Sequence, residues 1–413
     1  MKIALFSFLL PVILICSVSG DIHAQNVSSP IDIPLVTVTY TNSANGVTYE
    51  KLGIWASLGT GSTPQLFEFD TGGAGFYAAY ATNSPWWGSS DVPSSTPAFN
   101  TYGSGITYVG TQVETSFSLY TNGSASSQVF QSQGNIAVGM ATNIYNIYGS
   151  PPSNELWPTN VSNLNTPPVE SYFYGDFGLS LNNNGSNSIL NALAQLNYSS
   201  GILPGYIVHV SPYGVTNGSY IQIGLTASDI TNFASSGSVF PIAGQTTNLF
   251  FTSTTIPTCT NGQAITATMQ IGTNVFANIG VNLDTGTPTP TIHDPSSGGV
   301  PTNQYSGNSL NSGLALTLSA TNTNGTTSSV FSLTSGTNYG SDQVDIKVDG
   351  KGFYITAGIP AFYGNDVMYN LAGGTVGIIQ SVPEPASLTL LGIAAGGVAL
   401  AYGRRIFRKN PPA

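Results

Sequence analysis

The sequence has very little charge and almost no cysteine. Only 6% of its 413 residues are charged, and positions 22–380 contain three lysines, no arginine and sixteen acidic residues. An acidic body of this kind repels phosphate backbones, which argues against nucleic acids as partners. The two cysteines are Cys16 and Cys259. Because Cys16 lies in a segment that we expect to be removed, we expect no disulfide within the mature chain.

Histidine is scarce as well. His209 and His293 lie far apart in the sequence and have no partners at metal-ligand spacing. Structural and catalytic metal sites need several such ligands close together. We therefore expect neither a metal site nor another cofactor.

Strong helical patterns are rare, whereas short β-branched and aromatic runs are frequent. These runs are broken by Gly, Asn and Pro, which is typical of a mainly β fold. Residues 35–40, 220–223 and 345–348 alternate with a period of two and are predicted strands. The clearest helical signal covers residues 188–196, with Asn187 or Ser188 as a candidate N-cap.

Both ends of the chain carry targeting patterns. Lys2 precedes an apolar stretch over residues 3–18, and small residues at Gly20 and Ala24 offer cleavage points, so residues 1–24 are a predicted signal peptide. At the other end, residues 387–402 are uncharged and apolar, and a basic cluster, 404–409, follows them. This length is near the lower limit for a membrane-spanning helix, and the basic cluster is expected to stay cytoplasmic.

Pro383, Glu384 and Pro385 stand just before that apolar stretch. Together with the short apolar helix and the basic tail, they make segment 382–413 resemble the PEP-CTERM sorting signal of Gram-negative bacteria. The resemblance implies an exosortase-type sorting machinery as partner and at least transient contact with the membrane. It also implies a place in the cell envelope, at the cell surface or in the extracellular matrix, with release if the tail is removed. A plain tail anchor is the alternative.

One tripeptide occurs twice in the remaining chain, each time after an apolar, strand-like run. The runs are 66–69 and 279–283, and the tripeptides are Asp70-Thr71-Gly72 and Asp284-Thr285-Gly286. Two carboxylates held close together cannot both ionise, so they share one proton. The ionised member can then take a proton from water while the protonated member donates to a carbonyl. The repeat therefore predicts a carboxylate dyad and duplicated lobes.

Further motifs occur in the order that the bilobal pepsin-like aspartic peptidases have, and residues 49–380 resemble this family. Residues 58–65 resemble the turn before the first catalytic strand, and 101–105 the tip of the flap hairpin. Residues 176–179 and 353–362 resemble the elements that cross behind the two motifs, and 366–378 the terminal strand pair. The resemblance implies a mainly β, bilobal acid-protease fold with two pseudo-symmetric lobes, 35–227 and 228–380, and a central cleft.

The resemblance also assigns roles to individual residues. Asp70 and Asp284 would be catalytic, and the residues that would support them are Thr71, Gly72, Thr285, Gly286 and Thr287. The flap residues Tyr102 and Gly103 would close over the substrate and exclude water. Tyr77 stands where the family has a Trp that is hydrogen-bonded to the flap Tyr, and its hydroxyl can still donate such a bond.

Several residues depart from the family pattern. Gly73 and Ala74 follow the first motif where a Ser is usual, and Pro288 follows Thr287. Glu68 lies two residues before Asp70, so on a strand both side chains share one face. We hypothesise that a buried Glu68 raises the apparent pKa values of the dyad.

The sequence thus predicts a secreted or surface-sorted aspartic endopeptidase that hydrolyses peptide bonds in a peptide or protein substrate. The alternative is a non-catalytic protein on the same scaffold, with a binding or structural role at the cell surface or in the matrix.

Overall fold

The computed structural model describes residues 26–41, 46–89, 91–149, 154–181, 189–243, 246–249, 255–258, 263–295, 299–350 and 352–380. The predicted signal peptide (1–24) and sorting segment (382–413), with its apolar span 387–402, lie outside these ranges. No helix within the described ranges is long and apolar enough to cross a membrane.

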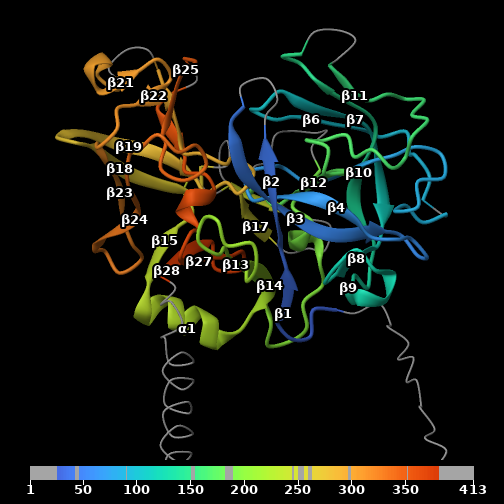
Figure 1. Ribbon diagram of the computed structural model, residues 1–413. Helices are drawn as coiled ribbons and strands as arrows, with labels where there is room; N and C mark the ends of the chain where they lie inside the picture. The colour runs from blue at the N-terminus through green and yellow to red at the C-terminus, as the bar shows by residue number, and fades with distance from the viewer. Residues whose placement is uncertain are drawn as a thin grey trace, which may run out of the picture.

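The first half of the chain forms an eleven-stranded sheet, drawn from blue to green in Figure 1. Its strands are β2 (Val36–Thr41), β3 (Thr48–Leu58), β4 (Gln65–Asp70), β5 (Phe76–Ala79), β6 (Pro97–Thr101), β7 (Ile106–Thr115), β8 (Phe117–Tyr120), β9 (Gln128–Gln131), β10 (Ile136–Asn146), β11 (Glu155–Trp157) and β12 (Gly175–Gly178). The main path runs β6-β7-β10-β5-β12-β4-β3-β8-β9, and β2 and β11 pair beside it.

The second half forms a nine-stranded sheet in yellow and orange (Figure 1). Its strands are β18 (Ile265–Ile271), β19 (Asn274–Asn282), β20 (Thr291–Asp294), β21 (Tyr305–Ser306), β22 (Ser309–Leu310), β23 (Ala315–Thr321), β24 (Thr327–Thr334), β25 (Asp345–Val348) and β26 (Tyr354–Thr356). Buried and non-buried residues alternate strictly along β18, as expected for a strand with one face on a core.

The two sheets repeat one topology around the two Asp-Thr-Gly motifs. In the first, β4 pairs in parallel with β12, which is antiparallel to β5, and β5 is parallel to β10. In the second, β19, β26, β20 and β25 follow with the same directions. This repetition confirms the two pseudo-symmetric β lobes expected from the sequence.

A six-stranded sheet with the order β1-β14-β13-β27-β28-β15 lies below the two large sheets in Figure 1 and joins the halves. It takes β1 (Ile31–Pro34), β13 (Leu203–His209) and β14 (Tyr220–Leu225) from the first half, and β15 (Ser238–Pro241), β27 (Asn365–Asn370) and β28 (Thr375–Gln380) from the second. At its centre β13 pairs with β27, and the rings of Tyr206 and Tyr369 stack 4.8 Å apart. The lobe boundary at 227/228 stays a prediction.

A separate hairpin joins β16 (Thr246–Leu249) and β17 (Thr255–Thr258).

The three alternating runs predicted as strands are confirmed as parts of β2, β14 and β25. The helix predicted over 188–196 is wrong for its described residues, which contain only the 3-10 turn Leu193–Gln195. The buried side-chain oxygen of Asn191 accepts hydrogen bonds from the backbone N–H groups of Leu193 and Ala194 at the start of this turn, and the chain becomes extended at Leu196, where ψ is 154°. The apolar residues of this segment are buried, but they do not form an α-helix.

The α-helix within the described ranges, α1 (Ala227–Ser236), was not predicted. Thr226 and Asp229 form a capping box at its start: the Thr226 hydroxyl accepts from the Asp229 N–H, and the Asp229 carboxylate accepts from the Thr226 N–H. The Thr-x-x-Asp pattern is a known start signal and would have located the helix.

Candidate active site

Equivalent positions of the two lobes carry the two aspartates. Asp70 is the last residue of β4, and Asp284 follows β19 by two residues. Behind the first motif, Phe67, Phe76 and Phe177 are fully buried and pack edge to face, with ring centroids 5.0 and 4.9 Å apart. Such aromatic pairs add to the stability from burial and hold the strand ends in place.

The threonines of the two Asp-Thr-Gly motifs connect the two loops through hydrogen bonds. Each backbone N–H, of Thr71 and of Thr285, donates to the hydroxyl of the other at 3.0 Å. Each hydroxyl in turn donates at 2.8 Å to a carbonyl of the opposite lobe, Leu283 or Phe69. Both threonines are buried, so these four hydrogen bonds fix the approach of the lobes.

The glycines of the motifs let the carboxyl groups come together. A Cβ atom on Gly72 would lie 2.2 Å from Cγ of Asp284, and one on Gly286 would lie 2.4 Å from Cγ of Asp70. Real Cβ atoms do not approach other atoms so closely, so both positions require glycine. Each glycine N–H also donates to the carboxyl of its own motif, at 2.7 Å to Asp70 Oδ1 and 2.8 Å to Asp284 Oδ1. The structure therefore brings Asp70 and Asp284 together, with Gly72 and Gly286 around them.

Burial raises the pKa of Asp70 well above its usual range, and the nearby carboxyl groups of Asp284, Asp176 and Glu68 raise it further. Asp70 is also hydrogen-bonded with Asp284, which favours its protonated form. Thr287 donates its hydroxyl to Asp284 Oδ2 at 2.7 Å. Two hydrogen-bonded carboxyl groups of this kind can hold one proton between them and can activate a water molecule.

Glu68 is paired with a residue that the sequence analysis did not single out. It is buried, and its Oε1 accepts from Lys51 Nζ at 2.5 Å. Burial raises the pKa of Glu68 to about 7, although Lys51 acts in the opposite direction. Lys51 also donates to the Gly286 carbonyl at 2.5 Å and lies 3.8 Å from Glu170. Lys51, which belongs to the first lobe, is thus hydrogen-bonded to the second Asp-Thr-Gly motif.

Tyr102 and Gly103, the predicted flap residues, lie in the turn between the antiparallel strands β6 and β7. The Tyr102 hydroxyl donates to Asp176 Oδ2. Tyr77 does not bond to Tyr102; its hydroxyl donates to the Phe99 carbonyl on β6 at 3.1 Å. Tyr77 therefore contacts strand β6 rather than Tyr102. A Cβ atom on Gly103 would meet nothing within 4 Å, so the tip of the turn is open.

Lys51 and Asp176 were missed as site residues, although each carried a sequence signal. Lys51 is one of three lysines between positions 22 and 380 and stands directly before a mainly apolar run, Leu52–Leu58. Asp176 occupies a position of the crossing element that would otherwise be apolar. A charged residue in a buried strand needs a partner, and that need is the signal in both cases.

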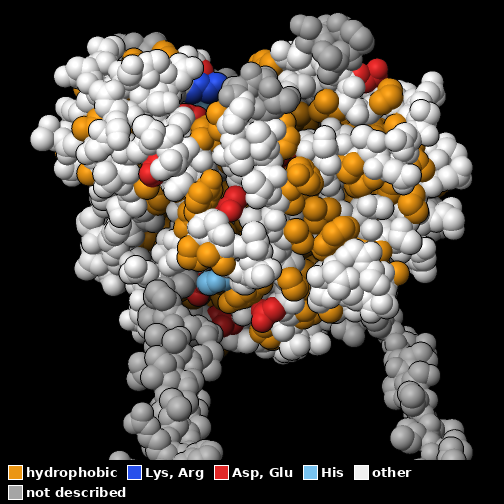
Figure 2. Space-filling model, viewed as in Figure 1, with side chains coloured by type: hydrophobic (Ala, Val, Ile, Leu, Met, Phe, Trp, Pro, Cys, Tyr) orange, Lys and Arg blue, Asp and Glu red, His pale blue; other side chains and the backbone are white. Residues whose placement is uncertain are grey.

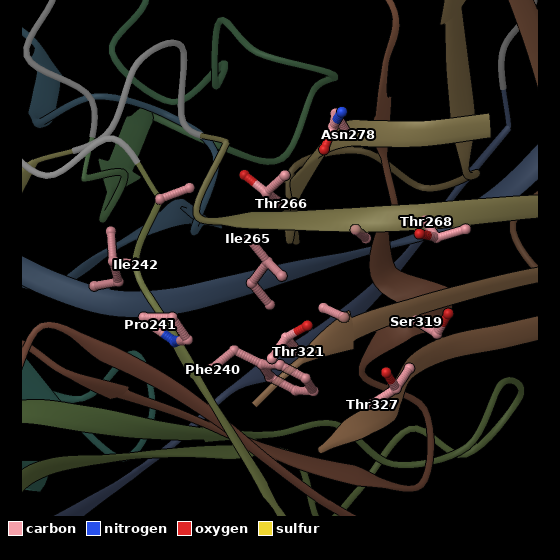
Figure 3. A pocket seen from close by; sticks show the side chains of 13 residues that line it. Phe240, Pro241, Ile242, Ile265, Thr266, Thr268, Asn278, Ser319, Thr321 and Thr327 are labelled. Carbon is pink, nitrogen blue, oxygen red and sulfur yellow. The ribbon is translucent and has the colours of Figure 1, made fainter. Parts of the chain in front are cut away.

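A cavity of about 380 Å³ lies away from the two motifs (Figure 3). Phe240, Ile265, Thr266, Ser319 and Thr327 are among its lining residues, and none of the dyad residues or their contacts lines it. It has no titratable side chain and therefore no means of acid–base chemistry. Among the described residues, no group of three or more His, Cys, Asp or Glu is arranged to hold a metal ion.

Three comparisons with known proteins complete the description. The family model of the PEP-CTERM protein-sorting motif matches residues 381–409. A search of curated proteins found no match. Among solved structures, the chain is similar to the aspartic proteinase from Irpex lacteus, with 15% identity and a TM-score of 0.52 over 85% of this chain and 97% of that one. It is also similar to Basic 7S globulin from soybean, with 13% identity and a TM-score of 0.50 over 86% and 95%.

These findings confirm two expectations from the sequence. The chain has the bilobal, mainly β fold of pepsin-like aspartic proteinases, and it carries a PEP-CTERM sorting motif at its C-terminal end. The motif implies recognition by an exosortase-type machinery and export to the cell envelope or surface.

Proposed function

We propose that this chain, which combines a PEP-CTERM sorting motif with the fold of pepsin-like aspartic proteinases, is an aspartic endopeptidase of the cell envelope or surface. The observation that carries the proposal is the contact between Asp70 and Asp284. The two carboxyl groups are hydrogen-bonded, and each lies against the glycine of the opposite motif. No other described pair of acids is held in this way by both lobes.

In this reaction one carboxylate takes a proton from a water molecule, and the resulting hydroxide equivalent attacks the peptide carbonyl. The protonated carboxyl group donates to the carbonyl oxygen, and the leaving amine then takes up a proton. Neither a covalent intermediate nor a metal ion enters these steps. Gly72 and Gly286 orient the carboxyl groups through their N–H groups. The Tyr102 side of the flap would shield the reaction from water.

The sorting motif supports the location of this activity outside the cytoplasm. Few charged side chains appear on the face shown in Figure 2, and apolar side chains are grouped over the first lobe at its right. The substrate would be a peptide or an unfolded protein segment that can lie in an extended form between the lobes.

The test is cleavage of an unfolded protein substrate by the purified full chain, over a range from acid to neutral pH. Asp70→Asn and Asp284→Asn remove one ionisable group each with little change in shape. We expect wild-type cleavage that a pepstatin-type inhibitor stops, and a loss of at least about 100-fold in either variant. A surface variant, Asp32→Asn, is the control. Folded wild-type protein without cleavage at any pH would refute the proposal and favour the binding or structural alternative.

A further inference from the structure

The cavity of Figure 3 forms where two neighbouring strands of the second sheet separate. β18 and β23 pair only through residues 268–271 and 316–319. Beyond this paired part, Ile265 near the start of β18 and Thr321 at the end of β23 line the opening from opposite sides, and Phe240 of β15 lies between them (Figure 3). The cavity is therefore framed by strands of two sheets.

The lining consists of a buried apolar floor and a polar rim. The floor includes Phe240, Ile242 and Ile265, which are at most 3% exposed. Buried and non-buried residues alternate along β18, so its threonines face solvent while their neighbours face the core. The polar side chains of the rim are Thr266, Thr268, Asn278, Ser319, Thr321 and Thr327.

The polar rim has unused capacity for hydrogen bonds. None of its six side chains makes a hydrogen bond to another described residue. A Ser or Thr hydroxyl can donate one hydrogen bond and accept two, and an Asn amide can donate two and accept two. The rim therefore suits a ligand whose own groups both donate and accept.

A β-bulge brings Asn278 to the rim. Ala277 and Asn278 of β19 stand opposite the single residue Thr268 of β18, where the register of the two strands shifts. Asn278 has a φ of 59°, a left-handed conformation that Asn adopts more readily than most residues with a side chain. A bulge re-aims a side chain, and bulges are frequent beside functional sites. Figure 3 shows the Asn278 amide above Thr266.

The lining disfavours charged ligands. It contains no Lys, Arg, His, Asp or Glu. An ion that entered the cavity would lose water without gaining an opposite charge, which is costly. The acidic body of the chain repels anions in addition. The ligand that fits this cavity is therefore polar and uncharged.

An extended peptide fits the cavity less well, because β15 cannot pair with it. The outward carbonyl of Val239 already accepts from the Thr323 N–H at 2.7 Å, and Pro241 has no N–H to donate. The opposite edge of β15 is paired with β28. Peptides that add a strand to a sheet depend on such main-chain donors and acceptors. Recognition in the cavity thus depends on the side chains of the rim.

We propose that this cavity binds a short segment of an uncharged carbohydrate chain. Sugar hydroxyls both donate and accept, as the rim requires, and the C–H face of a sugar ring can pack on the apolar floor at Phe240. The volume of about 380 Å³ lies within the range of small-molecule sites, roughly 300–1,000 Å³. The proposal does not rest on the proposed peptidase activity, because neither Asp70 nor Asp284 lines the cavity. For a protein exported to the envelope or surface, such binding would attach it to a polysaccharide there.

The test is isothermal titration calorimetry of the purified full chain with three uncharged hexasaccharides: cellohexaose, maltohexaose and chitohexaose. The comparison ligands are a hexagalacturonate, which adds carboxylates to the sugar rings, and an uncharged hexapeptide of Gly and Ser. We expect at least one of the three uncharged sugars to bind and neither comparison ligand to do so. Absence of binding by all three sugars overturns the proposal, as does equal or tighter binding of the galacturonate or the peptide.

Two variants locate the binding at the rim. Asn278→Gly removes the amide and accepts a positive φ, so the bulge is kept. Thr268→Val removes a hydroxyl and keeps the shape of the side chain. We expect each to weaken sugar binding by about two- to tenfold, the value of one hydrogen bond. Thr334→Val is the matched control, because Thr334 is an exposed threonine of β24 that does not line the cavity. Wild-type affinity in both rim variants, folded by circular dichroism, overturns the proposal.

The same measurements separate this site from the dyad. We expect Asp70→Asn and a pepstatin-type inhibitor to leave sugar affinity unchanged, and Asn278→Gly to leave any peptide cleavage unchanged. Competition between the inhibitor and the sugar would place the sugar at the dyad and overturn the proposal. A chain that cleaves no peptide but binds the sugar would refute the endopeptidase and support the carbohydrate site.

Discussion

Replacement of Lys51 by methionine is expected to destabilise the fold more than any other single loss of charge. Lys51 is buried at 7% exposure, and its ammonium group contacts the Glu68 carboxylate and the Gly286 carbonyl, both at 2.5 Å. Burial alone would lower the pKa of Lys51, but Glu170 and Glu68 raise it well above its usual value, so the group is a cation. Methionine has a similar length and no charge.

The expected loss depends on pH because Glu68 titrates. Breaking a buried ion pair by removing one partner costs about 3–5 kcal/mol, since the other charge is left uncompensated. This cost applies at about pH 8, where Glu68 with its pKa of about 7 is mostly ionised in the wild type. Near about pH 5 Glu68 is already protonated, so the loss is reduced to the hydrogen bond with Gly286 and the contact with Glu170, roughly 1–3 kcal/mol.

The assay is denaturant unfolding of wild type and Lys51→Met at both pH values. Lys347→Met is the matched control, because Lys347 is the other lysine within the described residues and lies partly exposed on β25. We expect a change within about 0.5 kcal/mol for that control. A loss below about 1 kcal/mol for Lys51→Met at the higher pH, or a loss that does not vary with pH, would refute the reasoning.

Two further predictions concern the neighbours of the dyad. The pKa of Glu68 is higher in the folded chain, about 7, than its ordinary value of 4.5, so this group makes the fold lose stability as pH rises between those values. Glu68→Gln removes the titration, and the decline of Tm across that range should become shallower; an identical decline would contradict the assignment. Gly73→Ser should destabilise the chain by about 1–3 kcal/mol, because its Cβ atom collides with Asp70 and Asp176. The same substitution in an Asp176→Ala background should cost less, and equal losses by thermal unfolding in both backgrounds would show that the two positions are not coupled.

Much of the fold could be predicted because its signals are local. The alternating runs gave the strands β2, β14 and β25 directly. The helical pattern over 188–196 failed because apolar spacing is found in buried segments of any conformation, and here the chain becomes extended at Leu196 after a short 3-10 turn. The helix α1 was overlooked although Thr226 and Asp229 marked its start.

The candidate site could be predicted in part. The repeated tripeptide located Asp70 and Asp284, because a strand that ends in Asp-Thr-Gly is visible within a few residues. The contacts of Glu68 could not be foreseen from its spacing to Asp70. Its partner Lys51 lies on another strand, and only the pairing of β3 with β4 brings that strand alongside.

The sequence by itself determined three features of this protein: its mainly β fold class, its two Asp-Thr-Gly motifs and its PEP-CTERM tail. The tertiary structure decided which groups surround each aspartate. Lys51 contacts Gly286 across 235 positions, and Tyr102 contacts Asp176 across 74. Such contacts depend on strand register and on the packing of one lobe against the other. They are set by the burial of distant residues in a common core, and no local pattern in the sequence encodes them.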